Sequence, residues 1–165
     1  MKLRTSLAAI LLSVANPTHA KLGVRIDVQV SDDKIKNSLQ ESMKARLNST
    51  ERYVITDSEV ATELLMEVSC LVLENEGGVK NGIVCDSVVM YYPYRGFQVS
   101  TRLDNAGNMA VSGIRESSFV IEKLMNHFMD GTTDSELAAQ KKFIQSSVQL
   151  LCQNHPNECK LAASK

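Results

Sequence analysis

A pair of apolar runs on either side of two glycines constrains the fold of this chain more than any other feature. Apolar residues alternate along residues 64–73, which is the period-two pattern of a half-buried strand. Gly77 and Gly78 accept the positive φ angles of tight hairpins, and a second apolar run follows over residues 83–92. The sequence therefore predicts an antiparallel hairpin centred on the two glycines.

The register of this hairpin places two cysteines opposite each other. Cys70 and Cys85 each lie seven residues from the glycine pair. Directly opposed β-carbons lie about 4.5–5.5 Å apart, close to the reach of a disulfide. A four-residue turn over residues 76–79 gives the cysteines the closer, non-hydrogen-bonded position. We therefore predict this longer turn and a Cys70–Cys85 disulfide.

Further strands are predicted on the carboxyl-terminal side of the hairpin. A breaker cluster at residues 93–96 is followed by alternation over residues 97–104. Residues 104–107 are typical of a turn, and the alternation resumes on its other side over residues 109–113. The centre of the chain is therefore predicted to be a meander of three or four strands.

The flanking segments predict a strand–helix–strand unit and two helices. Alternation over residues 24–30 indicates a first strand, Ser31 or Asp32 can cap a helix that ends near Asn48, and residues 53–55 form a short strand. After the meander, a helical apolar stripe over residues 116–129 ends at Gly131. The last helix is expected to turn these residues inward: Leu137, Ile144, Val148 and Leu151.

Two four-residue segments match the capping box of a helix start. They run from Thr56 to Glu59 and from Thr133 to Glu136. At most one helical turn fits after the first of them. Taken in order, the elements predict an α+β fold of two layers. Its sheet is mixed and mostly antiparallel, a β-α-β unit followed by a β-meander, with helices at the carboxyl-terminal end, because this arrangement buries every apolar stripe.

The first twenty residues have the pattern of a secretory signal peptide. Lys2 and Arg4 precede an apolar core over residues 7–14, and small residues precede a cleavage point after Ala20. The apolar run is too short to span a bilayer, so no membrane span is expected. We predict a signal peptide over residues 1–20 and a single domain over residues 21–165. The exported protein is expected in the periplasm, with secretion as the alternative.

All four cysteines lie in the exported part of the chain, and an even count there favours two disulfides. We pair Cys70 with Cys85, and Cys152 with Cys159, because each pair is local in sequence. The cysteine and histidine spacings do not match a zinc site.

Neither the charge nor the motifs indicate an enzyme or a nucleic-acid binder. Two of the 18 basic residues lie in the leader, which has no acid, so 16 basic and 19 acidic residues remain and the net charge is −3. That balance does not suggest a nucleic-acid surface. The motifs of serine hydrolases, zinc proteases and phosphate-binding loops do not occur. We therefore expect no catalytic residue, no metal and no cofactor.

An aromatic cluster is the one feature that suggests a binding surface. Tyrosine and arginine are enriched at binding hot spots. The cluster consists of Tyr91, Tyr92, Tyr94, Arg95 and Phe97. Two interpretations stay open: a partner-binding loop, or packing in which Tyr91 and Phe97 face the core while Tyr92 and Tyr94 cover a sheet edge.

The order of elements in the first half also resembles a group of periplasmic envelope domains. A helix ending in Leu47, a short strand at residues 53–57, a one-turn break at residues 59–63 and a strand from Leu64 follow one another. Over about residues 23–72 this order resembles the amino-terminal domain of TolB and the curli-secretion lipoprotein. The chain lacks the TolB propeller and has cysteines not associated with that group. The resemblance implies a periplasmic assembly or binding role.

Two functional classes follow from these observations. The first is a non-enzymatic periplasmic binding or assembly accessory protein of the cell envelope, which holds a protein partner through the aromatic loop or a sheet edge. The alternative is an exported inhibitor or immunity-type protein that neutralises a toxin or a wall-degrading enzyme. The two classes differ in their partner: an envelope component or a soluble hydrolase.

Overall fold

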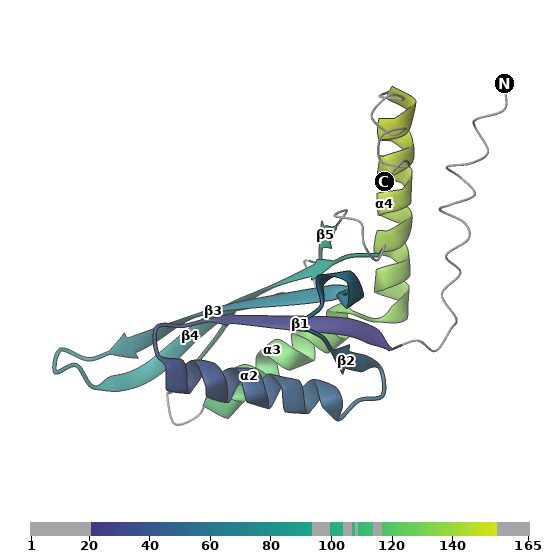
Figure 1. Cartoon of the computed structure of the whole chain (residues 1–165). Coiled ribbons are helices and arrows are strands. Elements are labelled where there is room, and N and C mark those ends of the chain that lie inside the picture. The colour runs from purple at the N-terminus through teal and green to yellow at the C-terminus, as the bar shows by residue number, and fades with distance from the viewer. Residues whose placement is uncertain (1–20, 94–99, 104–106, 108, 114–116, 155–165) are drawn as a thin grey trace, which may run out of the picture. The chain divides into compact units, whose positions relative to one another are not determined.

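The computed structural model describes residues 21–93, 100–103, 107, 109–113 and 117–154. Figure 1 shows a sheet with helices packed on one face, and the α+β prediction is confirmed. The elements are β1 (Leu22–Gln29), α2 (Asp33–Asn48), β2 (Tyr53–Ile55), a 3-10 turn (Glu59–Ala61), β3 (Leu64–Glu74), β4 (Lys80–Tyr91), β5 (Thr101–Arg102), β6 (Met109–Gly113), α3 (Ser117–Gly131) and α4 (Asp134–Asn154).

The chain divides into two compact units. Lys21–Lys142 forms the first, which contains the sheet, α2, α3 and the start of α4. The second consists of Met1–Ala20 and Phe143–Lys165, of which the structure describes residues 143–154. The predicted signal peptide lies outside the described residues, and the single domain over residues 21–165 stays a prediction.

The sheet is mixed, as predicted. Its strands lie in the order β2-β1-β3-β4-β5, and β6 also pairs with β4. β1 runs parallel to both β2 and β3, whereas β4 runs antiparallel to β3, β5 and β6. The β1–α2–β2 unit therefore extends one side of the sheet, and the hairpin extends the other.

The hairpin has the predicted register and a different turn. Cys70 lies opposite Cys85 with 4.1 Å between their Cα atoms, and the two form a disulfide. The Asn75 backbone N–H donates to the Val79 carbonyl, so three residues form the loop instead of four. Gly78 supplies the positive φ of +73° that this loop needs. An irregularity beside Leu73 then restores the predicted pairing in the body of the hairpin.

The edge beyond β4 corrects the predicted meander. β5 and β6 both run antiparallel to β4, so they point in the same direction along its edge. β5 and β6 therefore do not form the predicted hairpin with each other; residues 104–106 of the predicted turn lie outside the described residues. Gly107 lies so close to β4 that an added Cβ would stand 2.5 Å from the Ser87 carbonyl oxygen. Glycine is required there because the chain returns to the edge of the sheet by close backbone contact.

The helices cover one face of the sheet. α2 starts and ends as predicted: the Asp32 carboxylate caps it by accepting the backbone N–H groups of Lys34 and Ile35. α3 ends at Gly131, also as predicted. Both helices turn apolar stripes toward the inner sheet face, and the buried core joins side chains of α2, α3, β1, β3 and β4, including Leu39, Met43, Val24, Ile26, Met66, Val89, Leu124 and Phe128.

The capping boxes form only in part. The Thr56 hydroxyl accepts the Ser58 N–H. The N-cap of the 3-10 turn is Ser58, so Glu59 is the first residue of the turn and not the third, which is the position that the capping box requires. At α4, the Glu136 N–H donates to the Thr133 hydroxyl at 3.4 Å, but the Glu136 carboxylate accepts from Gln140 instead.

The inward stripe predicted for α4 ends early. Leu137 and Ile144 are buried, Val148 is half-buried, and Leu151 is 59% exposed. The periodic pattern marks an amphipathic helix, but it does not tell how many of its turns another element covers.

Candidate binding face of the sheet

The sheet has one covered face and one outer face, and the outer face changes character along β3. On β3, residues alternate between buried and exposed positions. Near β1 the outer face is polar: the Arg25 guanidinium and the Asp27 carboxylate form an ion pair of 3.0 Å. The two charged side chains of β1 therefore neutralise each other where β1 and β3 run side by side.

Toward the hairpin tip the outer face becomes apolar. The register places Leu71 opposite Val84, and Val84 opposite Val111. Leu71 is 65% exposed and Val111 is 54% exposed, and Met109 beside them is 62% exposed. We call these side chains the aliphatic row: Leu71, Val84 and Val111. Contiguous exposed apolar side chains on a sheet are typical of contact surfaces.

An open depression lies at the inner end of this row, where β1 ends. Its volume is about 470 Å³. The last residues of β1 and the turn into α2 form one wall, while Leu71, Val84 and Asp86 form the other. The depression therefore combines a sheet edge, three aliphatic residues (Val30, Leu71 and Val84) and the one carboxylate of Asp86.

Acidic side chains surround the row. Glu67 and Asp86 are exposed on the strands, and Glu74 and Glu76 are exposed near the tip. Among the described residues, none of these four forms an ion pair, although the charge of Glu74 contributes to the raised pKa of Lys80. Glu67, Glu76 and Asp86 therefore give this part of the molecule a negative charge that no described ion pair balances.

The nearby Lys80 ammonium is occupied elsewhere. It forms an ion pair with the Asp32 carboxylate, which joins the hairpin to the cap of α2. The hydrogen bond from Lys80, together with that from the Ile35 N–H, lowers the pKa of Asp32 below its usual value. The same hydrogen bond raises the pKa of Lys80.

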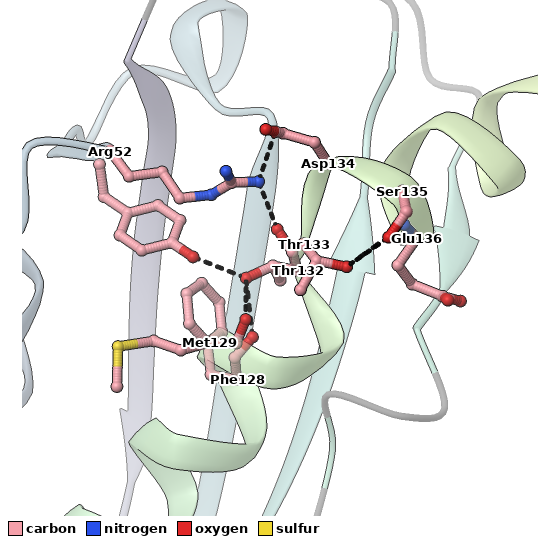
Figure 2. A network of polar contacts seen from close by, with 9 residues as sticks. Arg52, Phe128, Met129, Thr132, Thr133, Asp134, Ser135 and Glu136 are labelled. Carbon is pink, nitrogen blue, oxygen red and sulfur yellow. Dashed lines mark hydrogen bonds and ion pairs between the residues drawn. The ribbon is translucent and has the colours of Figure 1, made fainter.

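A second polar cluster joins the α3–α4 corner to β2 (Figure 2). The Arg52 guanidinium donates to the Thr132 carbonyl at 2.6 Å and pairs with the Asp134 carboxylate at 2.8 Å. The Thr132 hydroxyl donates its one hydrogen to the Phe128 carbonyl at 2.7 Å. The Tyr53 hydroxyl, 2.8 Å from the Thr132 oxygen, therefore acts as the donor to it.

This corner cluster fastens β2 to the α3–α4 corner. Burial is the largest single influence on Arg52 and opposes its charge, but the hydrogen bond with Asp134 and the interactions with Tyr53 and the Asp134 charge together outweigh it, so the pKa of Arg52 is raised. The Arg52 Nε atom is buried without a partner among the described residues. A cavity of about 350 Å³ beside it is lined in part by three residues of the cluster, Arg52, Tyr53 and Asp134. Sequence reasoning missed this cluster because Arg52 and Thr132 are 80 residues apart.

The predicted site residues are only partly visible. Tyr91 is buried in the core, and Tyr92 is half-buried with its N–H donating to the Glu63 carbonyl. The rest of the aromatic loop lies outside the described residues: Tyr94, Arg95 and Phe97. A partner-binding role for the loop stays a prediction. Cys159 also lies outside them, so its pairing with Cys152 stays a prediction.

The described residues contain neither a membrane-spanning helix nor a cluster of metal-binding side chains. No helix there is long and apolar enough to cross a membrane. Nor do three or more histidine, cysteine, aspartate or glutamate side chains gather there in a way that could hold a metal ion.

Comparison with known proteins gives weak likenesses of fold. No family model matches the chain, and no curated protein does. The rare lipoprotein B from Shewanella oneidensis is 7% identical, with 76% of this chain and 98% of that chain covered and a TM-score of 0.26. An uncharacterized lipoprotein B from Nitrosomonas europaea is 10% identical, with 82% and 90% covered and a TM-score of 0.24. These scores carry no functional argument, and the finer resemblance to TolB and the curli-secretion lipoprotein stays a prediction.

Proposed function

We propose that the chain is a non-enzymatic accessory protein of the cell envelope, which binds a protein partner on the outer face of its sheet. The observation that carries this proposal is the aliphatic row on the face opposite α2 and α3, in which Leu71 and Val111 are exposed and Val84 between them is half-buried. Burying aliphatic side chains contributes about 25 cal/mol per Å² of area removed from water. A partner that covers the row therefore removes aliphatic area from water, as α2 and α3 do on the inner face, and this burial stabilises the complex.

Export to the periplasm is part of the proposal. The leader pattern over residues 1–20 supports it, and so does the Cys70–Cys85 disulfide, because such bonds persist in oxidising compartments. The acidic surroundings of the row favour a partner with basic side chains near its contact surface.

Site-specific photo-cross-linking in the cells that make the protein tests the proposal. A photoreactive side chain at Val111 of the full chain should give a discrete cross-linked product, and Leu71→Ser in the same chain should weaken it. The matched control carries the photoreactive side chain at Glu122, which is exposed on α3. Equal products from both positions, or a Val111 product unaffected by Leu71→Ser, would contradict the proposal.

The mass of the cross-linked partner distinguishes the two functional classes. An envelope component supports the accessory role. A soluble toxin or wall-degrading enzyme supports the inhibitor or immunity role instead, and its activity should then fall when the purified chain is added.

A further inference from the structure

The backbone of β3 has one open edge beside the depression. Cys70 and Cys85 are directly paired with 4.1 Å between their Cα atoms, the short distance of a non-hydrogen-bonded antiparallel pair. Because bonding directions alternate along a strand, odd-numbered residues of β3 bond to β4 and even-numbered residues face β1. β1 pairs with β3 only as far as Ser69, although β3 continues to Glu74. The backbone N–H and C=O of Val72 therefore point to a side where no described strand lies.

Among the devices that protect sheet edges, this edge has only the irregularity between Leu73 and Glu74, at its end near the tip. Proteins blunt an exposed edge with proline, with lysine, with bulges or by keeping it short. β2 is only three residues long, and the β5–β6 edge is interrupted at Gly107. Residues 70–74 contain neither proline nor lysine. Of these three edges, the one along residues 70–74 is the one built for pairing.

The disulfide holds this edge in strand conformation before anything binds. An isolated two-stranded hairpin is marginally stable in water. Cys70 begins the open stretch, and its bond to the buried Cys85 ties the stretch to the core. A partner strand therefore meets an ordered template and loses less entropy on binding.

The side chains around the edge indicate what the added strand carries. Leu71 and Val84 form an apolar floor, and the exposed Asp86 carboxylate stands at its end, where it forms no ion pair with a described residue. A lysine or arginine can lay its aliphatic stem on such a floor and place its charge at a carboxylate. An acidic side chain in that position would be repelled.

We propose that β3 accepts an extended strand of a partner protein along residues 70–74, with aliphatic residues at alternate positions and a basic side chain directed to Asp86. This inference rests on the proposed function, because it names the edge and the chemistry by which the outer face would hold its partner. Main-chain hydrogen bonds to Val72 supply the affinity, and the aliphatic row and Asp86 supply the selectivity.

A defined peptide tests this proposal without knowledge of the partner. The probe is an eight-residue peptide of alternating valine and lysine, titrated into the full exported chain. Binding should be saturable, and it should slow hydrogen exchange at the Val72 amide. Two control peptides should each bind at least about tenfold more weakly. One has glutamate in place of lysine, and the other has N-methylated backbone amides on the side that faces β3.

Matched variants locate the contact. Asp86→Asn should weaken the lysine peptide severalfold, whereas Glu122→Gln, which removes an exposed carboxylate on α3, should leave it unchanged. Val72→Pro should abolish binding, since proline removes the open N–H. The N-methylated peptide makes the same test if that variant does not fold.

Three results overturn the proposal. The first is equal binding of the N-methylated and the unmodified peptide, and the second is failure of the wild type to bind the lysine peptide. Protection of Val72 that rises with protein concentration alone would show that a second copy occupies the edge. None of these results decides the photo-cross-linking experiment at Val111. The proposed function is therefore still tested separately if the strand proposal fails.

Discussion

The two halves of β3 are built in different ways. Residues 64–69 lie between β1 and β4, and their inward side chains Leu64, Met66 and Val68 are almost fully buried. Residues 70–74 have β4 on one side only, expose Leu71, and carry the disulfide. Burial holds the first half, and a covalent bond holds the second. The difference shows how a strand can leave its core and still stay ordered.

The same substitution in each half should separate these two kinds of support. Leu64→Ala should lower the free energy of unfolding by about 2–5 kcal/mol, because it leaves a cavity in a fully buried site. Leu71→Ala should change it by at most about 0.5 kcal/mol, because that side chain is exposed. Urea denaturation of the two variants measures both. Comparable losses would mean that the tip is packed as tightly as the core.

Removing the disulfide should destabilise the second half selectively. Replacing both Cys70 and Cys85 by alanine should cost about 3 kcal/mol for a sequence separation of 15. Hydrogen exchange should accelerate at Leu71 and Leu73, while amides of residues 64–68 keep protection closer to the global stability. Uniform acceleration along the whole strand would show that the bond supports the fold as a whole.

The polar corner tests whether the covered part also depends on buried hydrogen bonds. Thr132→Val keeps the shape of the side chain but leaves the Tyr53 hydroxyl and the Phe128 carbonyl without their partner. We expect a loss of about 1–3 kcal/mol in the free energy of unfolding. In a Tyr53→Phe background, Thr132→Val should lower the free energy of unfolding by less. Additive losses in the double variant would show that the two hydroxyl groups do not depend on each other.

The smallest effect should come from the ion pair that joins the tip to α2. Asp32 has a lowered pKa, so its contribution is present above the usual value of 3.8 and is lost as the pH falls through the folded value. Lys80 has a raised pKa, so its contribution is present below 10.5 and is lost as the pH rises above that. The stability difference between wild type and Lys80→Met should therefore shrink at both extremes of pH. Lys44→Met, which breaks a pair within α2, controls for the lost charge. If the stability difference between wild type and Lys80→Met stays constant down to strongly acidic pH, the ion pair between Asp32 and Lys80 does not contribute to stability.

Local signals predicted some of this architecture well. The glycine pair fixed the pairing of Cys70 with Cys85, and Asp32 marked the start of α2, because a turn and a cap are set by neighbouring residues. The outer aliphatic row was not predicted. It arises from pairing between β4 and β6, and the sequence does not show that Met109–Gly113 returns to β4 in the same direction as β5.

The candidate site depends on a relation between distant segments. The open edge exists because β1 ends opposite Ser69, and parallel pairing of β1 with β3 brings together residues 40 positions apart. Alternation gives each strand a face, but it does not tell which strand lies beside it or where that neighbour stops. The corner at Thr132 escaped prediction for the same reason.

Hydrogen exchange along β3 tests the central claim most directly. If β3 has an open edge past Ser69, the Val68 amide, which faces β1, should exchange slowly and the Val72 amide should exchange fast. The Leu73 amide, nearer the tip but bonded to β4, should exchange more slowly than Val72, so fraying from the tip does not explain the pattern. Equal protection of Val68 and Val72 in the monomeric chain would contradict the account, because another segment would then occupy the edge.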